Sequence, residues 1–66
     1  MEIQGRELKD SDVGSKVTYV PMHVNGDAGH KDCEHGTISS WNDLYVFVNY
    51  GTGTNQATSP DDLVWG

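Results

Sequence analysis

The segment at residues 44–50, LYVFVNY, constrains the fold more than any other part of the chain. It is dominated by β-branched and aromatic residues, which favour strands. Because side chains alternate across a strand, its two faces differ in character. One face, expected to face the core, carries Leu44, Val46, Val48 and Tyr50. The other carries Tyr45, Phe47 and Asn49.

Four further short segments have strand character, at residues 16–20, 36–41, 56–58 and 63–65. Asn42 and Asp43 form a two-residue connection between the second and third strands, which predicts a hairpin. Before the last strand, Ser59 is a candidate N-cap and Pro60 suits the first position of one tight helical turn.

A long segment rich in turn-forming residues, at positions 22–35, separates the first two strands. Five short strands with a long first loop and a single 3-10 turn before the last strand are the layout of an SH3-like barrel. We therefore predict an all-β fold. Residues 1–12 have only Ile3 and Leu8 as aliphatic side chains, so we expect a flexible lead-in followed by a barrel domain at 13–66.

Charge and cysteine content narrow the function classes. The chain has 66 residues with a formal net charge of −6, from 10 acidic and 4 basic residues. Nucleic-acid affinity depends on Lys and Arg neutralising phosphates, so direct DNA or RNA binding is disfavoured. An acidic surface keeps a small protein soluble, and it can also attract a basic protein.

The same composition bears on location. The lone cysteine, Cys33, forms no internal disulfide, and the sequence MEIQGRELKD lacks the pattern of a signal peptide. No apolar run is long enough for a membrane span. We expect a cytoplasmic protein that does not bind membranes.

The long loop concentrates the residues that bind metals. Imidazole and thiolate are typical ligands of tetrahedral zinc, and this segment supplies His23, His30, Cys33 and His35. Their spacing, His-x6-His-x2-Cys-x-His, is not a common zinc pattern. Either a structural Zn²⁺ stabilises this loop, or three histidines and one quiet thiol share it without binding metal. Cys33 as a catalytic nucleophile has no supporting pattern.

Aromatic residues suggest a second candidate site. Exposed aromatic side chains mark contact surfaces on small barrels, and the candidates here are Trp41, Tyr45, Phe47 and Trp65. The alternative is that the N-terminal segment covers them as a second small core.

The run VTYVPMHVNGDAGHKDCEHGTISSWNDLYVFVNY, followed by TSPDDLVW, resembles a group of small, functionally uncharacterised phage and prophage proteins. The most specific parts of the resemblance are Pro21, His23, Gly26-Asp27, His30, Cys33-Glu34, Gly36, Val46-Phe47-Val48 and Pro60-Asp61-Asp62-Leu63. It implies an SH3-like or Tudor-like β module with no established activity, in a bacterial host cell. This chain departs from such relatives at His35, and it is shorter than them between Tyr50 and Thr58.

Together these features predict a non-enzymatic module that binds a protein partner or another copy of the chain. A small zinc-stabilised domain is one alternative. An acidic inhibitor that imitates nucleic acid and blocks a host enzyme is the other.

Overall fold

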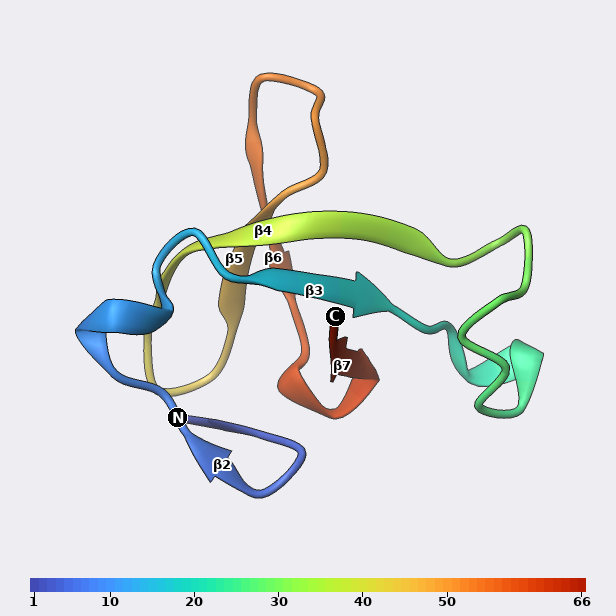
Figure 1. Ribbon diagram of the computed structural model, residues 1–66, viewed down its shortest axis with the longest axis horizontal. Coiled ribbons are helices and arrows are strands. Elements are labelled where there is room, and N and C mark those ends of the chain that lie inside the picture. The colour runs from blue at the N-terminus through green and yellow to red at the C-terminus, as the bar shows by residue number, and fades with distance from the viewer.

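A computed structural model describes all 66 residues, and its architecture is all-β. Four consecutive strands form an antiparallel meander, and a fifth returns to pair with the first of them (Figure 1). These strands are β3 (Lys16–Tyr19), β4 (Glu34–Trp41), β5 (Val46–Asn49), β6 (Asn55–Thr58) and β7 (Leu63–Trp65). Their order in the sheet is β6-β5-β4-β3-β7. The all-β prediction is confirmed.

The core lies on one face of this sheet. Val46 and Val48 of β5 are fully buried and Phe47 between them is not, as the alternating pattern predicts. Ile38 of β4 lies directly opposite Val48 in the ladder, and opposed residues share a face. The full core cluster consists of Ile3, Leu8, Val17, Ile38, Val46, Val48 and Leu63.

The turn between β4 and β5 is longer than the sequence predicted. The side chain of Asn42 accepts hydrogen bonds from the backbone N–H groups of Leu44 and Tyr45, at 2.8 and 2.7 Å. This local turn holds both residues outside the strand. The prediction that Leu44 faces the core is therefore wrong, since Leu44 is 70% exposed.

Residues 1–12 contribute to the core. β1 (Glu2–Ile3) and β2 (Arg6–Glu7) form a small antiparallel hairpin, followed by the 3-10 turn η1 (Asp10–Asp12). The turn of the hairpin places Gln4 and Gly5 at φ values of 51° and 80°. Ile3 is fully buried and Leu8 nearly so. The sequence predicted a flexible lead-in at 1–12, yet both of its aliphatic side chains pack against the sheet.

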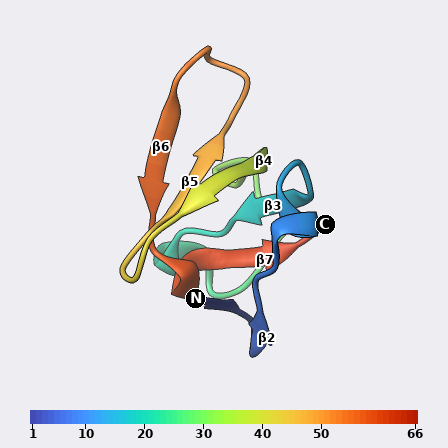
Figure 2. The same ribbon diagram turned by 90° about the vertical axis from the view of Figure 1, so that its left-hand side faces the viewer.

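The sheet remains open. β6 and β7 are its two edges, and η3 (Pro60–Asp62) connects them without any backbone pairing between the two strands. The predicted helical turn before the last strand is confirmed, with the Ser59 hydroxyl accepting a hydrogen bond from the N–H of Asp61 at 3.3 Å. A closed barrel is absent, and Figure 2 shows the β5–β6 hairpin projecting beyond the other strands.

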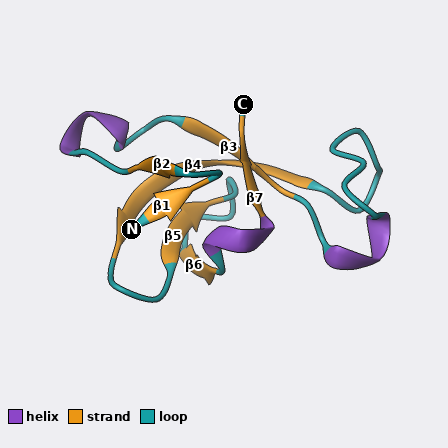
Figure 3. Cartoon of the chain, turned by 90° about the horizontal axis from the view of Figure 1, so that it is seen from below, coloured by secondary structure: helices purple, strands orange, loops and turns teal.

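The predicted long loop connects β3 to β4. It contains the 3-10 turn η2 (Met22–Val24) and a series of tight turns, including one with Asn25 at a φ of 53°. Figures 1 and 3 place this loop at one end of the long axis and η1 at the other. No helix in the structure has the length and apolar character needed to cross a membrane.

Candidate functional site

The histidines of the long loop contact an acidic residue. His23 donates a hydrogen bond from Nε2 to Asp32 Oδ2 at 2.8 Å. His30 Nδ1 accepts a hydrogen bond from the backbone N–H of Asp32 at 3.0 Å. The rings of His23 and His30 are arranged edge to face, with their centroids 6.1 Å apart. The hydrogen bond from His23 holds the pKa of Asp32 below its usual value, and the nearby His30 adds to this effect.

The other two predicted metal ligands point elsewhere. The Cys33 thiol donates to the carbonyl oxygen of Asp27 at 3.2 Å. Thr18 donates its only hydroxyl proton to the carbonyl oxygen of Gly66 at 2.6 Å, so the bond of 2.7 Å to His35 must come from a protonated Nδ1. The structure contains no group of three or more His, Cys, Asp or Glu side chains arranged to hold a metal ion. The four predicted zinc ligands are therefore not brought together.

Trp65 is covered by the N-terminal hairpin. Its indole Nε1 donates to the carbonyl oxygen of Ile3 at 3.0 Å, and the guanidinium of Arg6 lies 3.7 Å from the ring centroid. Arg6 also donates to Asp12 Oδ1 at 2.7 Å. Trp65 thus follows the alternative reading, in which the N-terminal segment covers aromatic residues.

The remaining predicted aromatic residues do not form one surface. Trp41 lies opposite the buried Val46 and packs against the core. Phe47 pairs with Ser40 on β4, so it occupies the other face of the sheet. Tyr45 lies in the turn and is 45% exposed.

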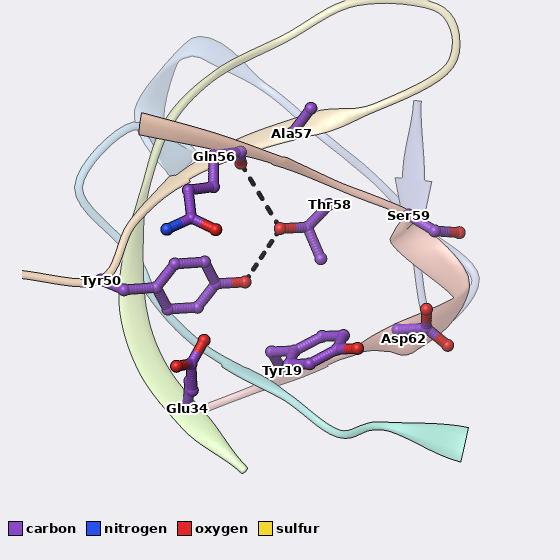
Figure 4. A pocket seen from close by; sticks show the side chains of 8 residues that line it. All are labelled: Tyr19, Glu34, Tyr50, Gln56, Ala57, Thr58, Ser59 and Asp62. Carbon is purple, nitrogen blue, oxygen red and sulfur yellow. Dashed lines mark hydrogen bonds between the residues drawn. The ribbon is translucent and has the colours of Figure 1, made fainter. Parts of the chain in front are cut away.

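A surface cavity of about 310 Å³ lies at the open side of the sheet. Its lining comes from the ends of several elements and consists of Tyr19, Glu34, Tyr50, Gln56, Ala57, Thr58, Ser59 and Asp62 (Figure 4). Tyr19 and Glu34 are direct partners in the β3–β4 ladder, so their side chains share a face. Tyr50 follows β5, and both tyrosines pack against the core. The cavity is therefore the place where the core face of the sheet meets solvent.

A hydrogen-bond chain fixes the ring of Tyr50. The Tyr50 hydroxyl and Thr58 Oγ1 share a hydrogen bond of 2.9 Å in which either can donate, and Thr58 Oγ1 also lies 3.4 Å from the carbonyl oxygen of Gln56. Burial raises the pKa of Tyr50 above its ordinary value of 10.0, and the negative charge of Glu34 adds to the rise. The raised pKa of this phenol therefore matters only in alkaline solution.

Gly36 makes room for that ring. A Cβ atom at this position would lie 2.7 Å from both the carbonyl oxygen of Asn49 and Cγ1 of Val48. It would also lie 2.9 Å from Cδ1 of Tyr50. The absence of a side chain on β4 is thus what lets the ring lie across the strand.

This cavity was not predicted from the sequence. Tyr50 was assigned to the core face of its strand, and Tyr19 was given no role in a site. The usable signal was the pair of strand-end tyrosines, on 16–20 and 44–50, since Tyr has an apolar ring and a polar tip that suit a solvent boundary. The acidic residues of the cavity could not be found without the strand register. Only the pairing of β3 with β4 shows that Glu34 lies beside Tyr19.

The chain matches no protein-family model, and it shows no significant similarity to a curated protein or to a solved structure. The resemblance to small phage proteins therefore stays a prediction.

Proposed function

We propose that this chain is a non-enzymatic protein-interaction module with an SH3-like arrangement of strands, and that it binds a basic partner protein in a bacterial cell. The strand order supports the fold proposal, because an antiparallel meander whose last strand returns to its first is the arrangement expected for such modules. The net charge of −6 supports a basic partner, because complementary charge steers association.

One observation carries the proposal: the cavity at the open side of the sheet is lined by two tyrosines and two carboxylates. Tyrosine is enriched at protein contacts because it combines large apolar area with a polar tip. Ligand sites are commonly concave, with a few polar groups that fix orientation. The proposed contact surface therefore moves to the side of the molecule that carries this cavity, whose lining includes none of the predicted contact residues Trp41, Tyr45, Phe47 and Trp65.

A capture experiment tests the proposal. The full chain is immobilised, exposed to bacterial lysate, and washed with rising salt up to about 1 M, where the Debye length falls to about 3 Å. We expect basic proteins to be retained at low salt and released as salt rises. Binding of each purified partner is then measured by calorimetry.

Two results would contradict it. One is retention of no protein above an empty support, and the other is retention that salt does not weaken. Sedimentation of the chain alone shows whether it binds another copy of itself. Self-association can then be distinguished from binding of a different protein.

A further inference from the structure

The aromatic part of the cavity offers ring surface to a bound group. Tyr19 and Tyr50 are each half-buried, with one side against the core and the other toward the cavity. In Figure 4 the rings of Tyr19 and Tyr50 and the carboxylate of Glu34 point into one common space, with Asp62 near the hydroxyl end of Tyr19. The negative face of an aromatic ring attracts cations.

The carboxylates of the cavity have no cation of their own. The structure has two ion pairs and two histidine–carboxylate contacts, and none of the four includes Glu34 or Asp62. No lysine or arginine lines the cavity. The site therefore has negative charge and ring surface without a positive group to match them.

We propose that this cavity binds a lysine or arginine side chain of the partner protein. The inference rests on the proposed function and names the chemical group that the partner presents. The cationic head lies against the rings of Tyr19 and Tyr50, and its N–H groups donate to the carboxylate of Glu34, with Asp62 adding charge at the rim. The Tyr50 hydroxyl oxygen keeps acceptor capacity beside its bond to Thr58, so it can also accept from the cation.

The chain already contains one example of this chemistry. Arg6 lies over the ring of Trp65 at 3.7 Å and donates to the carboxylate of Asp12 at 2.7 Å. Ring, carboxylate and cation thus combine within this fold, and the cavity has the first two.

Titration with single amino-acid derivatives tests the inference without a known partner. Nitrogen-15 spectra of the full chain are recorded with acetylated, amidated lysine or arginine. Norleucine, which lacks the ammonium, and citrulline, which is a neutral copy of arginine, are the paired controls. We expect saturable shifts at Tyr19, Glu34, Tyr50 and Thr58 with the cationic compounds only.

Charge-matched variants locate the site. Glu34→Gln removes the central carboxylate and is expected to weaken binding about tenfold, as for loss of a hydrogen bond to a charged group. Asp43→Asn removes the same charge from the exposed β4–β5 turn and should leave binding unchanged. Tyr50→Phe keeps the ring and should retain most of the affinity.

Three results would overturn the inference. The first is the absence of a saturable shift up to about 0.1 M of the lysine or arginine derivative, about a hundredfold above a Kd of 1 mM. The second is equal shifts with norleucine or citrulline. The third is equal weakening of binding by Glu34→Gln and Asp43→Asn. If basic proteins are captured equally well by the Glu34→Gln variant, the partner binds elsewhere and only this inference fails. If the amino acids bind but no protein is captured, the proposed function fails and the cation site stands.

Discussion

Two regions of the molecule combine an aromatic surface with acidic side chains, and they differ in whether the chain supplies the cation. At Trp65, the N-terminal hairpin places Arg6 over the ring and Asp12 beside the guanidinium. At the cavity, Tyr19 and Tyr50 provide the rings, but no basic residue of the chain reaches them.

The difference arises because one edge strand of the sheet is covered by the chain and the other is not. The β7 edge is covered, since the Gln4 side chain accepts from the backbone N–H of Trp65 at 2.9 Å and the β1–β2 hairpin packs there. The β6 edge pairs only with β5, and no segment of the chain covers it. An uncovered edge is where a second chain can approach. The chain thus completes one site internally and leaves the other open.

The largest expected effect comes from removing the anchor of the covered site. Ile3→Ala deletes a fully buried side chain and should lower the free energy of unfolding by about 2–5 kcal/mol. A chain of this size has a total stability of about 3–10 kcal/mol. Urea unfolding measures the change, and Ile3→Val, expected to cost about 0.5–1.5 kcal/mol, keeps the test readable if the alanine variant does not fold. A loss near zero for both variants would show that the hairpin does not anchor the core.

The second-largest loss of stability is expected from a substitution beside the cavity. Gly36→Ala places a Cβ against the backbone of Asn49 and the ring of Tyr50, so we expect a loss of about 1–3 kcal/mol and displacement of the ring. Gly29→Ala is the matched control, because its Cβ would meet only Asp27 Oδ1 at an ordinary 3.5 Å. Thermal unfolding compares the two. Equal melting temperatures would mean that the close approach at Gly36 is unimportant.

A smaller loss of stability is expected when the site at Trp65 loses its cation. Arg6→Gln removes the cation from Trp65 and leaves Asp12, whose side chain is 12% exposed, with only its hydrogen bond from the backbone N–H of Lys9. We expect a loss of about 1–2 kcal/mol, limited because the arginine is 56% exposed. The tryptophan fluorescence, to which Trp41 also contributes, should change in the same variant. Lys31→Gln, which removes an exposed positive charge in the long loop, should change neither quantity.

The smallest effect concerns alkaline pH. The pKa of Tyr50 is raised in the folded state, so its stabilising contribution is fully present below the unfolded value of about 10 and is lost as pH rises through the folded value. Urea unfolding from pH 8 to above pH 10 should therefore show that the free energy of unfolding of the unsubstituted chain declines. Part of this decline should be absent in Tyr50→Phe. At neutral pH this variant should lose only about 0.5–1.5 kcal/mol, from the bond to Thr58. Identical alkaline slopes would contradict the burial of the phenol.

The strands were predictable because their side chains alternate locally. Val46 and Val48 are buried, and the capped turn at Ser59 forms where the Ser-Pro sequence predicted it. Leu44 was misplaced because the hydrogen bonds of Asn42 to the following backbone outweigh the strand propensity of the segment.

The N-terminal hairpin and the cavity were not predictable for a different reason. Twelve mostly polar residues with two aliphatic side chains give a weak periodic signal, although Ile3 is fully buried. The cavity depends on which strand ends meet, and the register that pairs Tyr19 with Glu34 is set by the whole sheet. The zinc hypothesis rested on residue types in one loop and stays a prediction; the sequence did not indicate that His35 would bond to Thr18 across the ladder.

The bond between the Trp65 indole and Ile3 joins residues 62 positions apart. Contacts this distant in sequence require closure of a long loop, so they are expected to develop late and to slow the search for the native state. The hairpin at 1–7 should therefore dock last, after the meander has assembled. In a Trp41→Phe variant the Trp65 indole is the only tryptophan, so its emission reports docking at that junction, and stopped-flow refolding of this variant would time the docking.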